Sequence, residues 1–369
     1  MRSFMPNFRR PNTHRQGLSR RFVAAAVAAA SLSLVLASCS SALPSTDAAA
    51  VDSGAELTPL SLQLGWLIDD GIAGEAVALS KGWYEDAGID LEIKAGGPSL
   101  DGVALVSSGA SDIGQLSSSP SLMLARSQGI PVQAFAAGLQ KHPYTFFSLE
   151  DNAVTEPRDL IGKTVGVQAT GQVLLQAVLA ANDIDPSDVT VQVVGSEITP
   201  LTTGAVDVWT GWATTASIAR TLGEVDKDYF EMALWDAGVQ LYPRVYYATE
   251  STLADKPETL ATYLEVTSRG WEYAYANLDE AAAAVAALAP GLDTEIIAEG
   301  ITIAHAYEAD GSGTRVNWGT MDPDVWANQL DTWESLGLFP NAVPALDDVI
   351  NTTILDDTKT TRVKISDEL

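Results

Sequence analysis

The sequence predicts an α/β protein of two lobes, each built on a mainly parallel β-sheet flanked by helices. Strand-like and helix-like segments alternate between residues 60 and 116, and strands and a helix follow again between residues 164 and 209. This alternation indicates parallel pairing, because neighbouring parallel strands need a crossover connection, which is usually a helix. In open sheets of this kind, ligands bind beyond the carboxyl ends of the strands. We therefore expect the binding site where these strands end.

The first lobe begins with three strands and two helices in one short run. Apolar and polar residues alternate in 60–66 and 89–93, which is the period of a half-buried strand. Apolar residues recur at helical spacing in 72–83 and 100–106, and a third strand is expected at 112–116. The carboxyl edge of this sheet therefore consists of the residues that follow the first and third strands.

The second lobe follows a break in this alternation at 141–150, which we interpret as the first crossing between lobes. Its strands are expected at 164–168, 189–193 and 206–209, and the chain should return near 242–247. Three further helices and a charged, loosely ordered tail should complete the chain. The predicted ranges are 58–145 and 248–350 for lobe one, 146–247 for lobe two and 351–369 for the tail.

Composition narrows the possible functions. The chain of 369 residues has a formal charge of −27, and its first 39 residues carry only basic charge, so the remainder is more acidic still. Such a surface argues against a nucleic-acid partner. Cys39 is the single cysteine, and only His142 and His305 lie beyond the leader. This material excludes disulfide bonds and cysteine-rich metal sites, and we expect no metal and no cofactor. His142, beside a proline, is expected to be an exposed hinge residue.

Residues 1–39 have the pattern of a signal peptide. A basic region through Arg20 and Arg21 precedes an apolar run at 22–36, which suits a signal core and is too short for a comfortable membrane span. The sequence Leu36-Ala37-Ser38-Cys39 looks like a bacterial lipobox. That resemblance implies cleavage before Cys39 and attachment of acyl chains that hold the protein on the cell membrane. The arginine pair also resembles a twin-arginine signal, so the export route stays open. Residues 40–57 are expected to form a flexible linker, because they are rich in Ala, Ser and Asp and show no periodicity.

Five short motifs carry a likeness to a known family. They are residues 82–91 (GWYEDAGIDL), 109–114 (GASDIG), 159–167 (DLIGKTVGV), 204–207 (GAVD) and 256–258 (KPE). Each motif is weak alone, but the five occur in the family's order. The chain resembles the substrate-binding proteins that serve ABC importers of nitrate, sulfonates, taurine, thiamine pyrimidine precursors and riboflavin.

This resemblance implies a type II periplasmic-binding-protein fold, in which two crossings join the lobes and one ligand is held between them. Closure about the hinges would present the loaded form to a permease and its ATPase subunits. The family performs no chemistry on the ligand, so we do not expect an enzyme. An extracytoplasmic monomer anchored through Cys39 is the expected form.

Aromatic and polar side chains gather where the strands of the first lobe end. Trp66 could stack on a ligand, with burial in the core as the alternative. Asp69 and Asp70 could accept hydrogen bonds from an amine or a ring nitrogen of the ligand, or they could cap the next helix. Ser117, Ser118 and Ser119 combine hydroxyls with free N–H groups at a helix start, which suits an acceptor or an anion. Helix capping alone would explain Ser119. The candidates are Trp66, Asp69, Asp70, Ser117, Ser118 and Ser119.

Lobe two and the crossings supply the opposing candidates. In the family, the loop at 168–171 contacts the ligand through N–H groups and a hydroxyl. One of Trp209 and Trp212 should be a core residue. Arg244 could reach the ligand, with a surface salt bridge as the alternative. The candidates are Tyr144, Gln168, Thr170, Gly171, Trp209, Trp212, Arg244 and Tyr246.

An aromatic-lined cleft favours a planar heteroaromatic ligand, either a thiamine pyrimidine precursor or a flavin. Residues 66–70 depart from the Trp-x-Pro-Asn of the pyrimidine-precursor proteins, which leaves the ligand open. The alternative is a sulfonate, taurine or nitrate-type oxyanion held by the serines, Thr170 and Arg244. A solute sensor is a further alternative. The thiamine-pyrimidine synthases of this fold need a cysteine-rich motif that this chain lacks.

Overall fold

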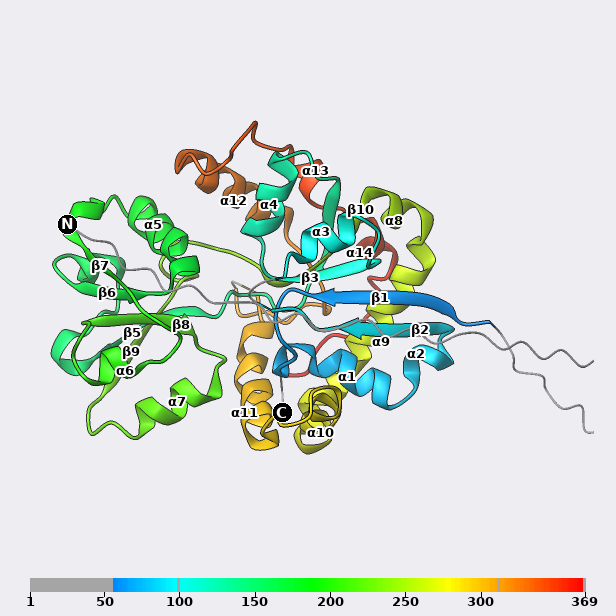
Figure 1. The fold of residues 1–369 in the computed structure, drawn as a ribbon, viewed down its shortest axis with the longest axis horizontal. Helices are drawn as coiled ribbons and strands as arrows, with labels where there is room; N and C mark the ends of the chain where they lie inside the picture. Colours follow the sequence, from blue (N-terminus) through cyan, green and yellow to red (C-terminus); the bar gives the residue numbers. More distant parts are fainter. Residues whose placement is uncertain (1–55, 98–99, 311, 368–369) are drawn as a thin grey trace, which may run out of the picture. The chain divides into compact units, whose positions relative to one another are not determined.

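The computed structural model describes residues 56–97, 100–310 and 312–367. The predicted signal peptide, Cys39 and nearly all of the predicted linker lie outside these residues. The chain from Gly54 on forms one compact unit with two five-stranded sheets. The strand orders are β2-β1-β3-β10-β4 and β7-β6-β8-β5-β9, and helices flank each sheet (Figure 1). The predicted α/β class and the two lobes are confirmed.

The first sheet begins as the sequence predicts. Strand β1 (Thr58–Leu64) pairs in parallel with both β2 (Ile89–Lys94) and β3 (Ile113–Ser118). Strand β10 (Pro243–Thr249) then lies antiparallel between β3 and β4 (Val132–Ala137). The carboxyl ends of β1, β2 and β3 therefore share one edge, and the start of β10 lies beside them.

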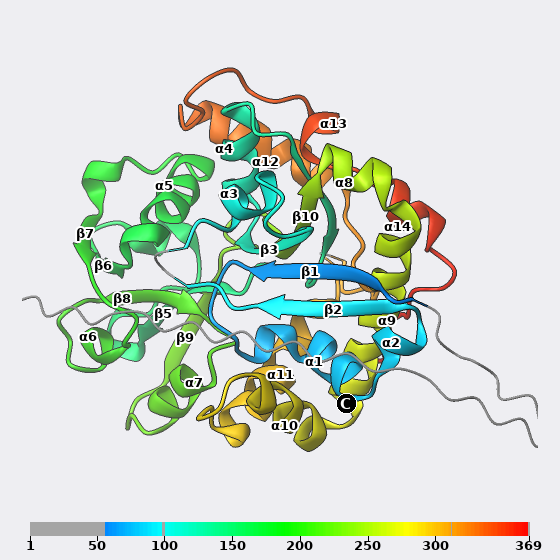
Figure 2. The same cartoon turned by 45° about the vertical axis from the view of Figure 1, so that its right-hand side comes forward.

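Helices cover both faces of this sheet. Figure 1 and Figure 2 show α1 (Ala73–Ser80), α2 (Trp83–Asp86) and α9 (Pro257–Ala276) on one side of β1 and β2, with α3 (Gly102–Ser107) and α4 (Pro120–Ser127) on the other. Helices α1 and α9 approach closely because glycines face each other. A Cβ atom on Gly270 would collide with the carbonyl oxygen of Gly74. This contact holds α1, and hence the end of β1, against the core.

The second sheet contains five short strands, three of which were expected as strands. Strands β6 (Thr164–Val167), β7 (Thr190–Val193) and β8 (Val208–Trp212) run parallel. Strands β5 (Tyr144–Leu149) and β9 (Tyr229–Ala233) are antiparallel to their neighbours at the other side. Its helices are α5 (Gln172–Ala181), α6 (Thr199–Thr202) and α7 (Ala216–Gly223). The segment that we expected as a plain crossing at 141–150 is therefore mostly the buried strand β5.

The observed crossings differ from the expected lobe boundaries at both points. Tyr144 and Thr145 already pair in the second sheet, so the first crossing ends before them. Residues 243–247, which the prediction placed in lobe two, pair with β3 and β4 in the first sheet. The proline and the aromatic residues of these segments do not show which of the two sheets a strand pairs with, and the predicted boundaries were therefore displaced.

The chain after β10 wraps back onto lobe one. Its helices are α8 (Glu250–Asp255), α10 (Leu278–Leu288), α11 (Thr294–His305), α12 (Pro323–Ser335), α13 (Leu346–Val349) and α14 (Thr353–Asp357). Short 3-10 turns are η1 (Asp70–Ile72), η2 (Glu150–Asn152), η3 (Pro157–Leu160), η4 (Ala169–Gly171), η5 (Pro186–Asp188) and η6 (Ala306–Glu308). Within the described residues, no helix is long and apolar enough to cross a membrane.

The tail is ordered through residue 367, contrary to the expectation of a loose segment. Ile354, Leu355 and Ile365 are buried. The buried guanidinium of Arg362 donates to the hydroxyl of Thr358 at 2.9 Å and to the carbonyl of Leu355 at 2.9 Å. The many charged residues of the tail indicated a loose segment. A few buried apolar residues and the hydrogen-bonded Arg362 are nevertheless enough to hold it in place.

Candidate ligand-binding site

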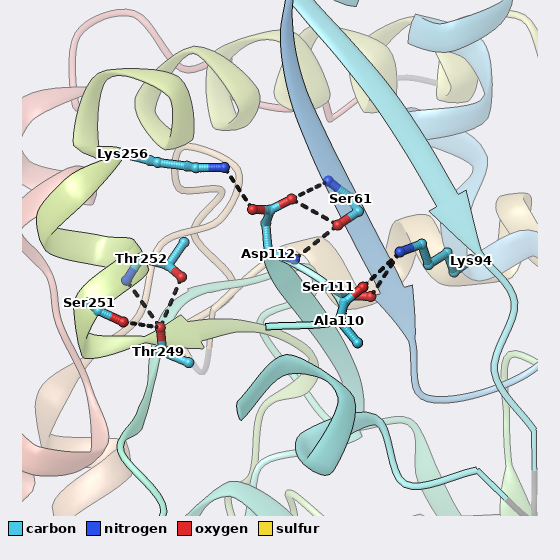
Figure 3. Close-up of polar contacts among 9 residues, drawn as sticks. All are labelled: Ser61, Lys94, Ala110, Ser111, Asp112, Thr249, Ser251, Thr252 and Lys256. Atoms are coloured by element: carbon cyan, nitrogen blue, oxygen red, sulfur yellow. Dashed lines mark hydrogen bonds and ion pairs between the residues drawn. The ribbon is translucent and has the colours of Figure 1, made fainter. Parts of the chain in front are cut away.

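The family-like motifs hold the fold together. Asp112, from the motif at 109–114, accepts hydrogen bonds from the backbone N–H and the hydroxyl of Ser61 at 2.9 and 2.8 Å, and its other oxygen lies 2.7 Å from Lys256 Nζ (Figure 3). Lys256 belongs to the motif at 256–258, so two motifs far apart in the chain meet at one carboxylate. This contact fastens β1, β3 and the start of α9 to one another.

In lobe two, aspartates of the family-like motifs also accept backbone hydrogen bonds. Asp207, from the motif at 204–207, accepts a hydrogen bond from the N–H of Thr164 at 2.8 Å, where β6 begins. Asp159 accepts hydrogen bonds from the N–H groups of Thr155 and Glu156 at 2.9 and 3.1 Å. These aspartates satisfy backbone donors that would otherwise be unpaired at element ends. These aspartates of the motifs therefore have structural roles.

Trp66 is exposed at the carboxyl edge of the first sheet. Its exposed fraction is 48% and that of Leu67 is 54%, although the strand before them is buried. The N–H of Gly96 donates to the carbonyl of Trp66 at 2.8 Å, which fixes the backbone of this loop. Burial in the core, the alternative reading of Trp66, is excluded. A large exposed aromatic side chain beside a strand end is a suitable surface for stacking.

The two aspartates that follow differ in what they do. Asp69 Oδ1 accepts the N–H of Gly71 at 2.8 Å and caps η1, which is the capping role that the sequence left open. Asp70 Oδ2 lies 3.3 Å from Arg244 Nη2, and its side chain is 21% exposed. Asp69 thus caps a backbone N–H, and Asp70 pairs with Arg244.

Arg244 is buried, which rules out the surface salt bridge considered as its alternative. Its side chain is 8% exposed, its guanidinium lies 5.0 Å from the ring centre of Trp271, and its Nη1 has no hydrogen-bond partner among the described residues. Its φ of +50° is a left-handed conformation that costs free energy in a residue other than glycine. Strain of this kind persists where the surrounding structure demands it, often at functional sites.

Several carboxyl groups surround this arginine, and two of them were not recognised from the sequence. Burial raises the pKa of Asp70 to about 7, the neighbouring charge of Asp69 adds to the rise, and Arg244 opposes it. Burial likewise raises the pKa of Glu308 to about 7, against the hydrogen bond from Tyr275 and the charge of Arg244. Burial also raises the pKa of Glu75. Glu75 and Glu308 sit in helix-like segments, where a charged residue normally predicts a solvated face.

The three serines have separate environments. Ser117 is exposed, and the Ser118 hydroxyl is buried without a partner among the described residues. Ser119 is fully buried and its hydroxyl donates to the side-chain oxygen of Gln329. Its N–H donates to the carbonyl of Tyr242 at 3.1 Å, so Ser119 fastens α4 to α12 and to the second crossing. We therefore no longer expect Ser119 to contact a ligand.

Tyr144 and Tyr246 are core residues rather than ligand contacts. Tyr144 is buried in β5 and donates to the hydroxyl of Thr210 at 2.7 Å. Tyr246 is fully buried in β10, where it accepts a hydrogen bond from Gln115 at 3.0 Å and donates to Glu75. Both strands are buried on both faces, so the side chains that we assigned to the ligand face pack inside their lobes.

The loop at 168–171 ends β6 and leads into α5. Gln168 is half-buried, and its carbonyl accepts the N–H of Gly171 at 2.8 Å. A Cβ atom at Gly171 would collide with the hydroxyl of Tyr144, so the tyrosine fixes the loop and requires glycine there. The side chain of Thr170 lies outside the described part of the chain. The loop has the position that the prediction required, at a strand end of lobe two.

The tryptophan pair of lobe two divides as the sequence anticipated, and the structure assigns the two roles. Trp209 is fully buried against Phe147, with ring centres 5.9 Å apart. Trp212 is half-buried, and its ring centre lies 4.8 Å from that of His142. Trp209 is therefore core, and Trp212 remains the candidate contact.

His142 is buried, contrary to the expectation of an exposed hinge residue. Its Nδ1 accepts the N–H of Tyr144 at 3.2 Å, and its Nε2 has no partner among the described residues. Burial lowers the pKa of His142 to about 3, so the ring is neutral. The proline that follows indicated a turn but could not show that Trp212 and β5 cover the ring.

A contact between the lobes lies away from the strand ends. Arg220 of α7 binds Glu299 of α11 through two hydrogen bonds of 2.7 and 2.6 Å. At the first crossing, the N–H of Gln140 donates to the carbonyl of Tyr307 at 2.9 Å. Neither pair was predicted, because partners so far apart in the chain give no joint pattern in one sequence.

Comparison with known proteins identifies the family of this chain. Residues 70–281, more than half of the chain, match the family described as NMT1/THI5 like. The chain belongs to the NMT1/THI5-like family. The predicted resemblance is therefore confirmed, and the match begins at Asp70 and includes the loop at 168–171 and all of α9.

Two relatives of this NMT1/THI5-like chain are binding proteins by name. A formylaminopyrimidine-binding protein from Halalkalibacterium halodurans is 27% identical over 254 residues, covering 67% of this chain and 74% of that one. The riboflavin-binding protein RibY from Chloroflexus aurantiacus is 27% identical over 274 residues, covering 67% and 73%. A shorter match, 31% identical over 134 residues and 36% of this chain, is a 4-amino-5-hydroxymethyl-2-methylpyrimidine phosphate synthase from Schizosaccharomyces pombe.

Solved structures confirm the fold of this family member. The periplasmic aliphatic sulphonate-binding protein SsuA from Escherichia coli superposes with a TM-score of 0.62 at 15% identity, covering 84% of this chain and 94% of that one. The periplasmic-binding-protein fold predicted from the motifs is therefore correct. Among the described residues, no group of three or more His, Cys, Asp or Glu could hold a metal ion.

Proposed function

We propose that this protein is the solute-binding component of an ABC importer and that it captures a planar heteroaromatic molecule between its lobes. The observation that carries the proposal is Trp66, an exposed aromatic surface at a strand end, four residues before Asp70, whose side chain is 21% exposed. Trp212 and the loop at 168–171 offer the opposing elements on lobe two. Two relatives named for a formylaminopyrimidine and for riboflavin support the same ligand class.

The charges near Trp66 favour a neutral or cationic ligand over an oxyanion. The charge of Arg244 acts on the carboxyls of Asp69, Asp70, Glu75 and Glu308. One guanidinium among four carboxyls leaves little positive potential for a sulfonate or nitrate. The oxyanion alternative would rely on Ser117, Ser118 and Thr170, and the fold shared with SsuA keeps it in the test.

The lipid anchor belongs to the same proposal. Cys39 at the end of the lipobox-like sequence would carry the acyl chains, and residues 40–57 would tether lobe one to the outer face of the cell membrane. Partners are then the permease and ATPase subunits of the importer, with the binding protein acting as a monomer. An enzyme of the synthase type lacks support, because Cys39 is the single cysteine in the chain.

A thermal-shift screen tests the proposal on the chain from Gly54 on, which forms one compact unit. Aminopyrimidines, flavins, alkanesulfonates, taurine and nitrate are added separately, and hits are titrated by calorimetry. A ligand at 100 times its Kd adds about 2.7 kcal/mol to the free energy of unfolding and raises Tm. Binding of an aminopyrimidine or a flavin supports the proposal. Binding confined to sulfonates, taurine or nitrate would transfer it to the oxyanion alternative.

A further inference from the structure

Asp70 is the carboxyl group of the Trp66 loop that pairs with the buried Arg244. The Oδ1 of the adjacent Asp69 accepts the N–H of Gly71 and caps η1. Asp70 Oδ2 lies 3.3 Å from Arg244 Nη2, and the Asp70 side chain is 21% exposed. The two neighbouring aspartates therefore offer a test residue and a matched control.

The carboxyl of Asp70 is held in place from two sides. Arg244 lies behind it, nine-tenths buried, with Nη1 unpaired among the described residues. On the other side is α11, where a Cβ atom at Gly300 would lie 2.8 Å from the carboxyl carbon of Asp70. The preceding residue, Glu299, binds Arg220 of lobe two. Asp70 thus lies against the helix that lobe two contacts.

The charged groups on the elements around η1 are mostly acidic. Arg244 on β10 is the cation that acts on Asp70, and Asp69 is the acid that acts on it most directly. Glu75 on α1 and Glu308 on η6 share the field of the same arginine. On α10, Glu280 is paired with Lys81 and Asp279 lies beside it, and on α11 Glu295 and Glu299 face Arg220. With acids in excess, a proton held on Asp70 relieves the repulsion, in line with its pKa of about 7.

A protonated carboxyl group presents one O–H donor and one carbonyl acceptor side by side. A 4-aminopyrimidine presents the complementary pair, a ring nitrogen that accepts and an amino N–H that donates. Carboxamide side chains read adenine by the same bidentate pattern. We propose that Asp70, positioned by Arg244 and Gly300, recognises the amino edge of a 4-aminopyrimidine ligand through this paired contact while Trp66 stacks on its ring.

This inference rests on the proposed function and fixes its ligand more narrowly. Two hydrogen bonds form, one from the carboxyl O–H to the ring nitrogen and one from the amino group to the carbonyl oxygen. The pair contains one proton in total, on Asp70 or on the ring nitrogen. Binding must therefore weaken once the pH is high enough to remove that proton from both partners.

Calorimetric titration of the full chain with 4-amino-5-hydroxymethyl-2-methylpyrimidine between pH 6 and 8.5 tests the inference. The Kd of the wild type should rise by up to about tenfold per pH unit above pH 7. Asp70→Asn should abolish this slope, because an amide offers a donor and an acceptor without titrating. Asp70→Leu should weaken binding at pH 6.5 by at least about thirtyfold, because both polar partners on the ligand are left unpaired.

Asp69→Asn is the matched control, since asparagine can cap η1 as aspartate does. It should keep the slope and move its onset to lower pH, because the charge of Asp69 contributes to the rise in the pKa of Asp70. The N4,N4-dimethyl analogue, which lacks the amino donor, should bind the wild type more weakly. A slope that persists in Asp70→Asn, or a flat wild-type profile, overturns this inference and leaves the proposed function intact. Failure of the wild type to bind any aminopyrimidine would overturn the inference, and binding of flavins alone would then still support the broader proposal.

Discussion

Arg220 and Glu299 join the two lobes by a two-point ion pair, with Nε–Oε2 and Nη2–Oε1 distances of 2.7 and 2.6 Å. Their helices, α7 and α11, belong to different lobes and contact each other here. Exposed ion pairs contribute little and are screened by salt, yet a bidentate pair at this point acts only when the lobes are together. We therefore expect the pair to favour a closed arrangement of the lobes over an open one.

Reversing the charge of Arg220 tests this bias. Arg220→Glu should weaken ligand binding by roughly two- to fivefold at low salt, with less effect at 0.5 M NaCl, because repulsion from Glu299 opposes closure. The double variant Arg220→Glu with Glu299→Arg should recover most of the affinity. Calorimetry at two salt concentrations measures both effects. Equal losses at both salt concentrations, without recovery in the double variant, would contradict an electrostatic latch.

Two tryptophans separate binding from stability. Trp66→Ala should lower ligand affinity by about tenfold or more while leaving Tm of the free protein nearly unchanged, because the side chain is 48% exposed. Trp209→Ala should do the reverse and cost about 3–5 kcal/mol of unfolding free energy, because it empties a fully buried site. Melting curves beside calorimetric titrations distinguish the pair. A large fall in Tm for Trp66→Ala would show that the residue supports the fold.

The carboxylate of Asp112 should matter for stability. Asp112→Ala removes the partner of Ser61 and of Lys256, and we expect a loss of about 1–3 kcal/mol in the free energy of unfolding. Lys256→Met, which removes only the ion pair, should cost less. Urea titrations measure both changes. If Asp112→Ala instead abolished ligand binding at unchanged stability, the motif would have to be assigned to the ligand site.

Glu308 should make stability depend on pH. Its pKa is about 7 in the folded protein and near 4.5 when unfolded, so the folded state holds the proton more tightly. Its contribution to stability is complete below about pH 4.5 and is lost as the pH rises toward 7. Glu308→Gln keeps an acceptor for Tyr275 and should raise Tm relative to the wild type at pH 8 more than at pH 5. An equal change at both pH values would show that Glu308 does not titrate in this range.

The anchor is tested outside the folded unit. Cys39→Ser should release the protein from the membrane fraction, because serine cannot form the thioether that holds the acyl chains. Fractionation and immunoblotting of cells that export the full chain measure this, with Ser40→Ala as a neighbouring control. Persistence of Cys39→Ser in the membrane fraction would exclude the lipobox.

The sequence by itself determined the α/β class and the family. Alternating periods between residues 60 and 116 were enough to predict the first three strands of the first sheet. The five motifs in order were enough for the family, although the partners that Asp112 and Asp207 bind, Ser61 and Thr164, lie far from them in the chain. The position of Trp66 and Asp70 at the carboxyl edge likewise follows from strand order, and their contact with a ligand stays a prediction.

Tertiary structure decided which candidate side chains are buried and which are exposed. Trp209 and Trp212 lie three residues apart in one strand, yet only packing against Phe147 or His142 assigns core to one and partial exposure to the other. Tyr246 and Tyr144 were misassigned because their strands are buried on both faces, where alternation no longer distinguishes inside from outside. The acidic surroundings of Arg244 come from three elements, η1 with its cap, α1 and η6. Desolvation and charge depend on distances in space, so the raised pKa of Asp70, and with it the proposed selectivity for an aminopyrimidine, exists only in the folded molecule.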